Sequence, residues 1–344
     1  MTSWYSNSPA RSWLTTVEPA DTRAFHESLE GYAPTRLVHL PSLAAELGVG
    51  HVVVKEENDR LGLPAFKFLG ASHAVSRALA ESPGSTVVAA TDGNHGRAVA
   101  RMAAMLGVAA RIFVPSSITV AAQRAIAGEG AQLTVLDVAY DDVVLHARRV
   151  AETEGGILVQ DSSWPGYERI PAWIVEGYST LFHEADAQLA ELGLVADLVT
   201  VPTGVGALAV AAVNHYRRGP GPTILVVEPE GAACVLASLT AGEPVAVPTG
   251  LTIMNGLNCG VVSPGAWPPM RDGVDAAITV TDAQSRRAVS DLRSLGVDSG
   301  PCGAASLAAV RALCASPERR ADAAITAASV LLLLSTEGLA ANPL

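Results

Sequence analysis

Short apolar runs alternate with alanine-rich stretches along most of the chain. The runs are rich in valine, leucine and isoleucine, as expected for strands buried on both faces of a sheet. They predict strands over residues 52–54, 86–90, 110–114, 132–136, 157–159, 198–201, 224–227 and 330–334. The stretches between them predict helices over residues 68–80, 96–106, 141–152 and 208–217. Strands and helices that alternate at this spacing indicate βαβ units and mainly parallel sheets, where function gathers at the carboxyl ends of the strands.

Composition narrows the class of protein. The chain has 344 residues, 49% of them apolar and 17% charged, which is typical of a compact α/β enzyme and not of a disordered chain. A net charge of −11 without a basic run argues against nucleic acid as a partner. The longest apolar stretch, residues 324–334, is far shorter than the roughly 20 residues of a membrane span. The N-terminal residues have no signal-peptide core, so a cytoplasmic protein is expected. The four cysteines lack zinc-type spacing, and no metal site is expected.

Lysine is scarce in this chain. Only Lys55 and Lys67 are present, and the other 21 of its 23 basic residues are arginine. A genome that favours arginine codons accounts for the bias. A lysine that remains in such a chain is more often needed as an amine, because a guanidinium does not deprotonate to form an imine.

Lys67 lies in a turn that opens a predicted helix, within residues 65–72 (AFKFLGAS). The helix dipole disfavours positive charge at this end, which predicts a lowered pKa for the Lys67 amine. The alternative is a surface lysine whose stem packs on apolar neighbours. The flanking Phe66 and Phe68, together with the scarcity of lysine, favour an amine poised to form a Schiff base.

Two further turns link predicted strands to predicted helices. Residues 91–96 (TDGNHG) contain two glycines, and free N–H groups at a helix start can bind a carboxylate. Residues 203–207 (TGVGA) place glycines before a helix N-terminus, which suits a phosphate. Taken singly, the first turn could be only a helix cap. The second is a weak signal that lacks the rest of a dinucleotide-binding fingerprint.

Together, and in this order, the three turns resemble the fold-type II (tryptophan-synthase-β-like) pyridoxal-phosphate enzymes, and within them the diaminopropionate ammonia-lyases. AFKFLG and TDGNHG form the specific pair. Other similar stretches extend over most of the chain, at residues 28–35, 55–72, 160–162, 166–171, 227–229, 252–254 and 335–338. The resemblance implies an α/β fold with two three-layer αβα subdomains and mainly parallel sheets. Residues 1–70 and 180–344 would form a large cofactor-binding domain, and residues 71–179 a small one.

The resemblance also implies a role for individual residues. Lys67 would bind pyridoxal 5′-phosphate as a Schiff base, and Asn94 would hydrogen-bond the 3′ oxygen of the cofactor. Asp92 and Asp161 would act as bases on opposite enantiomers of the substrate, although Asp161 could instead cap a loop after a strand. The phosphate would be held by four backbone N–H groups, those of Gly204, Val205, Gly206 and Ala207. The implied reaction is α,β-elimination on a small amino acid, with 2,3-diaminopropionate giving pyruvate and ammonia.

A neutral side chain beside the pyridine nitrogen of the cofactor favours elimination over transamination, because the nitrogen is then not firmly protonated. Two residues are candidates for this position. Thr336, just past the last predicted strand, is preferred to Cys302, which could be a structural residue at a helix start.

The chain departs from the pattern of the ammonia-lyases at several positions. Asn255 and Asn258 stand where small residues are usual, Pro301-Cys302 replaces a Glu-Ser pair, and residues 339–341 replace an acidic run. If Asn255 and Asn258 face the cofactor, they favour a different substrate; alternatively they cap a loop. The cysteines that match a disulfide-forming pair of the ammonia-lyases are Cys234 and Cys259. Whether they form a disulfide here stays open, since a reducing cytosol does not favour one.

Two other functions remain open. The first is a serine/threonine-type dehydratase or a β-replacement enzyme of a biosynthetic pathway. The second is a catalytically silent, pyridoxal-phosphate-binding regulatory protein, which the presence of Lys67, Asp92, Asn94 and Asp161 disfavours. A homodimer is expected from the resemblance alone.

Overall fold

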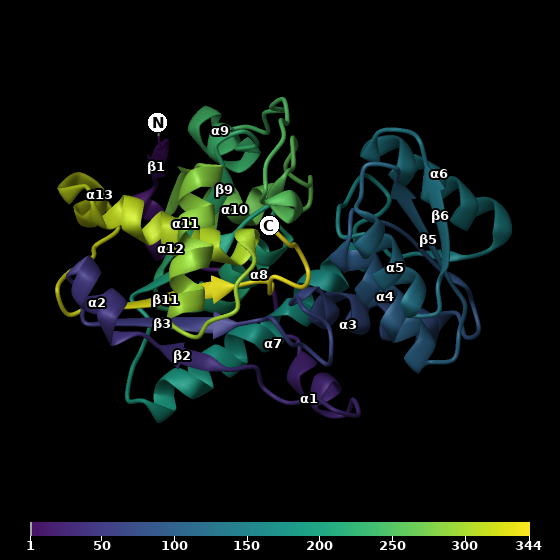
Figure 1. Cartoon of the computed structure of the whole chain (residues 1–344), viewed down its shortest axis with the longest axis horizontal. Coiled ribbons are helices and arrows are strands. Elements are labelled where there is room, and N and C mark those ends of the chain that lie inside the picture. The colour runs from purple at the N-terminus through teal and green to yellow at the C-terminus, as the bar shows by residue number, and fades with distance from the viewer. Residues whose placement is uncertain (1) are drawn as a thin grey trace.

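Two sheets of different size organise the chain (Figure 1). The computed structural model describes residues 2–344. In the larger sheet the strand order is β1-β10-β9-β8-β11-β3-β2. Its five inner strands are parallel, and β1 and β2 pair antiparallel at the two edges. These strands are β1 (Trp4–Ser6), β2 (Leu37–His39), β3 (His51–Glu56), β8 (Leu198–Pro202), β9 (Thr223–Pro229), β10 (Ala276–Val280) and β11 (Val330–Ser335).

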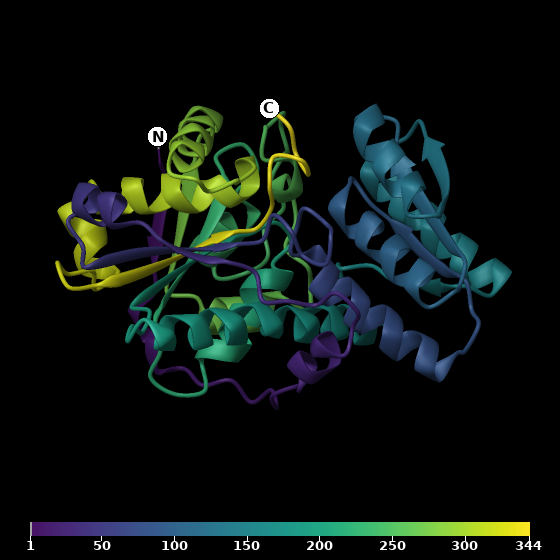
Figure 2. The ribbon, with the colours of Figure 1, turned by 60° about the horizontal axis from the view of Figure 1, so that its bottom comes forward.

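The smaller sheet is entirely parallel, with the strand order β6-β5-β4-β7. Its strands are β4 (Val87–Ala90), β5 (Ala110–Pro115), β6 (Gln132–Leu136) and β7 (Ile157–Leu158). Figure 2 shows it with its helices as a separate lobe beside the larger body. Helix α3 lies at the junction of the two lobes, and α7 runs along the larger body and packs against α3 (Figure 1).

The helices connect successive strands and cover the sheets. They are α1 (Thr22–Glu27), α2 (Pro41–Leu47), α3 (Lys67–Glu81), α4 (Asn94–Met105), α5 (Val120–Gly128), α6 (Tyr140–Glu154), α7 (Arg169–Glu191), α8 (Ala207–Tyr216), α9 (Cys234–Ala241), α10 (Trp267–Gly273), α11 (Asp282–Ser294), α12 (Pro301–Cys314) and α13 (Pro317–Asp322). Two short 3₁₀ helices, η1 (Ser8–Ser12) and η2 (Asn255–Leu257), complete the set. Among the described residues, no helix is long and apolar enough to cross a membrane.

The larger sheet separates two apolar cores. Successive side chains of a strand point to opposite faces. On β11, Leu332 and Leu334 pack in the core shared with α3, α7 and α8, whereas Leu331 and Leu333 pack in the core shared with α2, α11 and α12. The continuous apolar run over residues 330–334 is therefore explained by burial on both faces.

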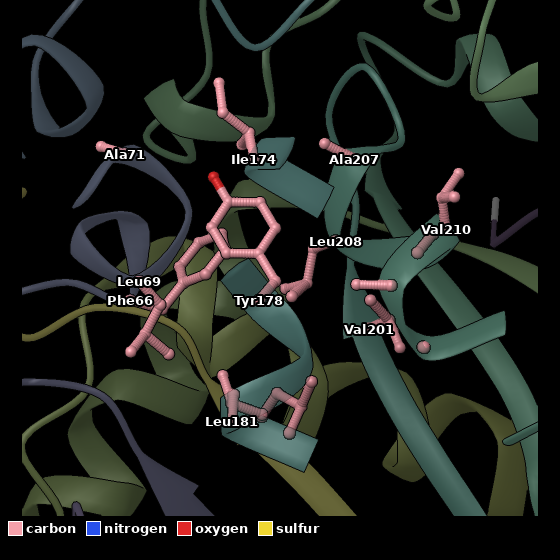
Figure 3. Close-up of a cluster of buried hydrophobic side chains, with 14 of the residues drawn as sticks. Phe66, Leu69, Ala71, Ile174, Tyr178, Leu181, Val201, Ala207, Leu208 and Val210 are labelled. Carbon is pink, nitrogen blue, oxygen red and sulfur yellow. The ribbon is translucent and has the colours of Figure 1, made fainter. Parts of the chain in front are cut away.

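Helices α3 and α7 approach each other closely through glycines. A Cβ added at Gly70 would lie 2.6 Å from Tyr178 Cε1, and one added at Gly177 would lie 2.4 Å from Leu69 O. Figure 3 shows the apolar cluster at this contact, with Phe66 and Tyr178 beside Leu69 and Ile174. This packing fixes the start of α3, where Lys67 lies.

The predicted α/β architecture with mainly parallel sheets is confirmed, and the strands and helices expected from the sequence are all present within a few residues. The sequence pattern did not predict strand β10, the edge strands β1 and β2 of the larger sheet or the 23-residue helix α7. The smaller sheet draws its strands from residues 87–158 and the larger one from residues 4–56 and 198–335. We propose that residues 71–179 form the small domain and that residues 1–70 and 180–344 form the large one. Helices α3 and α7 cross the boundaries between them.

Candidate active site

Lys67 is the first residue of α3 and lies between the two lobes. The segment before it is pinned beside the end of β11, because Phe66 N donates to Thr336 O (3.1 Å) and Gly338 N donates to Pro64 O (3.0 Å). The Lys67 amine contacts the face of Phe66, 5.4 Å from its ring centroid, and that of Tyr178 at 5.9 Å. Its Nζ donates to Asp161 Oδ2 at 2.7 Å.

Lys55 is not available as an amine nucleophile. Its Nζ is fully buried in β3 and donates to Thr35 O (2.8 Å), Glu184 Oε2 (2.7 Å) and Gln188 Oε1 (2.9 Å). An ammonium has three N–H donors, so all of them are used. Lys67, whose side chain is 22% exposed, is thus the lysine that a cofactor can reach.

The two aspartates expected as bases lie in the environment of Lys67. Asp92 follows β4 and Asp161 follows β7, and these strands are neighbours in the small sheet. Loss of hydration among the surrounding protein atoms, and then the negative charge of Asp161, raise the pKa of Asp92, while Lys67 opposes this shift; the residue itself stays exposed to solvent. Burial by itself would raise the pKa of Asp161 too, but the Lys67 cation and the Lys67 hydrogen bond outweigh it and hold the pKa well below its usual range.

The predicted lowering of the Lys67 pKa is wrong for this state of the protein. Burial does lower it, but the charge of Asp161 and the hydrogen bond to it dominate, and the pKa of Lys67 is raised. The effect of the helix dipole is of the order of 1 kcal/mol or less, and a partly buried ion pair at 2.7 Å exceeds it.

The 91–96 turn begins α4 and needs its second glycine. Thr91 Oγ1 accepts from Gly93 N (2.9 Å) and Gly96 N (3.1 Å), which closes the turn. A Cβ at Gly96 would lie 2.3 Å from Thr91 Cγ2. The turn directs Asn94 toward the end of β11, where its Nδ2 donates to Glu337 Oε2 at 3.1 Å.

The 203–207 turn connects β8 to α8 and forms a cradle lined by backbone. Gly206 has a φ of +110°, a conformation that favours glycine. A Cβ at Gly204 would lie 3.0 Å from Cys259 Sγ, and one at Gly206 would lie 2.6 Å from Met270 Cε. The first N–H groups of α8 have no acceptor within the helix, so they are free to bind an anion.

These features fit pyridoxal phosphate. The backbone N–H groups of the 203–207 turn would bind the phosphate. The Lys67 amine would bind the aldehyde, and Asn94 would reach the ring. The family of pyridoxal-phosphate-dependent enzymes matches residues 29–335 of the chain. The chain belongs to this family.

Comparison with individual proteins narrows the relationship within the family. A diaminopropionate ammonia-lyase of Salmonella typhimurium is 35% identical over 97% of this chain and 92% of its own length. The crystal structure of the Escherichia coli diaminopropionate ammonia-lyase, in complex with an aminoacrylate-PLP azomethine reaction intermediate, has a TM-score of 0.91 at 33% identity and covers 99% of this chain and 94% of that one. The biosynthetic L-threonine dehydratase of Escherichia coli is less similar, at 28% identity over 80% of this chain.

Both candidates for the pyridine-nitrogen position lie at the end of β11. Thr336 and Cys302 are buried, and Gly303 brings the start of α12 against the strand end, since a Cβ there would lie 2.8 Å from Thr336 N. Burial raises the pKa of the Cys302 thiol well above its usual range, so the thiol is neutral. Both residues therefore offer the neutral contact expected in this family, and the preference for Thr336 stays a prediction.

The two unusual asparagines have different environments. Asn258 Nδ2 donates to Gly250 O at 3.0 Å and caps a loop. Asn255 Nδ2 donates to Asn342 Oδ1 at 3.1 Å, close to Glu337. Cys234 and Cys259, the possible disulfide pair, are both free thiols.

Three further residues lie at the site, and the sequence pattern predicted no role for them. Tyr140 is 36% exposed, its hydroxyl accepts from Gln160 Nε2 at 3.0 Å, and it lies in the electrostatic environment of Asp92 and Asp161. His95 Nε2 donates to Val159 O (2.8 Å), while its buried Nδ1 has no partner within residues 2–344. Glu337 is buried next to Asn94. His95 and Glu337 lie inside stretches that resemble the family, but Tyr140 has no such signal.

Proposed function

We propose that this enzyme catalyses α,β-elimination of 2,3-diaminopropionate, consuming one water and releasing pyruvate and both nitrogens as ammonia. The observation that carries the proposal is the Lys67–Asp161 ion pair at 2.7 Å, with Asp92 in the same electrostatic environment. Pyridoxal phosphate, when bound, supplies the electron sink that stabilises a carbanion at Cα. The similarity to diaminopropionate ammonia-lyases over nearly the whole chain supports this substrate over a hydroxy amino acid.

Lys67 would hold the cofactor, and the charge on the Lys67 nitrogen governs the pKa of Asp161. The pKa of Asp161 is low because the Lys67 cation and its hydrogen bond overcome the effect of burial. Whenever the Lys67 nitrogen is uncharged, burial would act on Asp161 with less opposition, and the pKa of Asp161 would rise. A carboxylate with a higher pKa is a better proton acceptor at neutral pH, and such a base contributes roughly 10²–10⁴-fold to the rate.

Asp92 is the second proton acceptor. Its pKa is raised, first by loss of hydration among the surrounding protein atoms and then by the charge of Asp161, while the residue stays exposed to solvent. We assign Asp161 and Asp92 to opposite enantiomers of the substrate, as the family resemblance implies. The remaining groups hold the cofactor: Asn94 on the 3′ oxygen, the N–H groups of residues 204–207 on the phosphate, and Thr336 or Cys302 beside the pyridine nitrogen.

The test uses the purified chain loaded with pyridoxal phosphate, together with Lys67→Ala and Lys67→Arg. Arginine keeps a cation beside Asp161 but cannot form an imine, so Lys67→Arg controls for loss of the ion pair. The wild-type chain should show the visible absorbance band of an imine and release pyruvate and ammonia from at least one enantiomer of diaminopropionate. Neither variant should show the band or the turnover. Survival of the band in Lys67→Arg would refute the role of Lys67, and activity with serine or threonine only would replace the proposed substrate.

We further propose a cytoplasmic homodimer. Four free thiols are compatible with a reducing compartment, and the dimer is inferred from the family resemblance. Light scattering on the purified chain would show twice the 35.4 kDa mass of one chain if the dimer forms, and a single chain mass would exclude it.

A further inference from the structure

Glu337 is a buried carboxylate surrounded by hydrogen-bond donors at the edge of the proposed cofactor site. It is 4% exposed and lies two residues beyond the end of β11. Its Oε2 accepts from Asn94 Nδ2 at 3.1 Å. Its Oε1 accepts from the backbone N of Cys302 at 3.2 Å and from Asn342 Nδ2 at 3.3 Å.

The position of this carboxylate is fixed from several sides. The backbone N of Cys302 belongs to the first turn of α12, and a helix N-terminus favours an anion. Gly300 N donates to Glu337 O at 2.8 Å, and Ala65 pairs with Glu337 in an antiparallel bridge just before Lys67. The backbone of Glu337 is thus tied to the same segment that positions Lys67.

The orientation of Asn342 is fixed as well. Its Nδ2 donates to the backbone carbonyl of Ile253 at 2.8 Å, and its Oδ1 accepts from Asn255 Nδ2 at 3.1 Å. A carbonyl oxygen only accepts, so the nitrogen of Asn342 has to face both Ile253 and Glu337. Asn255 and Cys302, two of the positions that depart from the ammonia-lyase pattern, therefore meet around Glu337.

An ionised carboxylate accepts hydrogen bonds and cannot donate them, and this determines which end of the Asn94 amide faces Glu337. The atom near Oε2 has to be the nitrogen. An amide nitrogen carries two N–H groups, so one bonds Glu337 and the other remains for a second acceptor. Without an acceptor at this position the amide could turn over and present its carbonyl oxygen, which repels an oxyanion.

We infer that Glu337 is a positioning residue that orients Asn94, so that an amide N–H of Asn94 faces the 3′ oxygen of the cofactor. The inference rests on the proposed roles of Lys67 and Asn94, and it assigns to Glu337 an effect on the cofactor that is exerted through Asn94 alone. The 3′ oxygen carries negative charge when the imine is protonated. A lost N–H donor therefore weakens cofactor binding and shifts the imine away from the form that absorbs in the visible range.

The discriminating variant is Glu337→Gln, which keeps the size of the side chain. The backbone N–H of Cys302 cannot reverse, so a glutamine at this position places its carbonyl toward Cys302 and its NH₂ toward Asn94. Asn94 then turns its own oxygen toward that NH₂ and withdraws its N–H from the cofactor. Glu243→Gln makes the same chemical change at an exposed position and is the matched control.

Binding of pyridoxal phosphate and the spectrum of its imine are measured for the wild type, Glu337→Gln, Asn94→Ala and the double variant. We expect Glu337→Gln to raise the Kd for pyridoxal phosphate about tenfold, a change equivalent to about 1.4 kcal/mol, and to diminish the visible band. Glu243→Gln should match the wild type in both. The double variant should resemble Asn94→Ala, because residues that act through one contact are not additive.

A wild-type spectrum and Kd in Glu337→Gln overturn the inference, and so does an effect of Glu337→Gln that persists undiminished in the Asn94→Ala background. If Glu337→Gln fails to fold, Asn342→Ala decides, since it removes one donor from Glu337 and leaves Asn94 intact. A smaller loss of the visible band supports the inference, and an unchanged band refutes it. Absence of any imine band in the wild type instead refutes the proposed function, so the two failures are distinguishable.

Discussion

Gly206 offers a direct test of the phosphate cradle through the substitution Gly206→Ala. Its φ of +110° is one that residues with a Cβ rarely adopt, at a cost of about 1–2 kcal/mol. The new Cβ would also lie 2.6 Å from Met270 Cε and 3.0 Å from Ala266 Cβ, and Met270 is fully buried. Overpacking of this kind typically costs about 1–3 kcal/mol when the neighbours do not move.

The turn has two ways to respond, and they give different measurable results. If the turn keeps its shape, the strain destabilises the folded chain by roughly 2–5 kcal/mol. If the turn relaxes, its N–H groups move away from the phosphate and the strain reappears as lost affinity. Met270 can shift only against packed neighbours. We therefore expect the strain to lower both the stability of the folded chain and its affinity for pyridoxal phosphate, with the Kd raised at least tenfold.

The assay compares binding of pyridoxal phosphate with binding of pyridoxal, which lacks the phosphate. Gly206→Ala should weaken the first and leave the second nearly unchanged. Gly231→Ala is the matched control, because a Cβ there meets nothing within 4 Å and its φ lies outside the left-handed region. Wild-type affinity of Gly206→Ala for pyridoxal phosphate, or an equal loss of affinity for pyridoxal, would contradict the assignment of this turn to the phosphate.

Further predictions concern the bases and the stability of the fold. Asp161→Asn and Asp92→Asn should each slow elimination by roughly 10²–10⁴-fold on a different enantiomer of diaminopropionate, and equal losses on the same enantiomer would refute separate roles. Glu184→Gln should lower the free energy of unfolding by about 3–5 kcal/mol in urea titrations, because it leaves the buried Lys55 cation with one charged partner fewer; a loss below 1 kcal/mol would contradict this. Burial lowers the pKa of His26 from 6.5 to about 4. Between these pH values the His26 imidazole is protonated in the unfolded chain and neutral in the folded chain. His26 therefore does not lower the free energy of unfolding above pH 6.5 and lowers it by about 3 kcal/mol as the pH drops to 4. The variant His26→Gln should lack this part of the pH dependence in unfolding titrations.

Local patterns in the sequence determined much of the fold. The apolar run over residues 330–334 predicts β11 because burial on both faces leaves no polar position, and the glycines of the 91–96 and 203–207 turns mark the strand ends. Edge strand β2 escaped detection, since it is three residues long and pairs with only one neighbour. These signals act over a few residues, which is why they can be read without the tertiary structure.

The sequence also determined which amine carries the chemistry, since Lys67 had only Lys55 as a rival. Only the tertiary structure removed that rival. It buries the Lys55 amine among three acceptors, which come from Thr35, just before β2, and from Glu184 and Gln188 of α7. It also reversed the predicted direction of the Lys67 pKa shift, because Asp161 lies 94 residues away in sequence and is brought to 2.7 Å by the packing of the two lobes. Glu337 reaches Asn94 across 243 residues in the same way. Charge interactions depend on distance in space, so composition and spacing indicate which groups are present, and the packing of the lobes decides which of them act on one another.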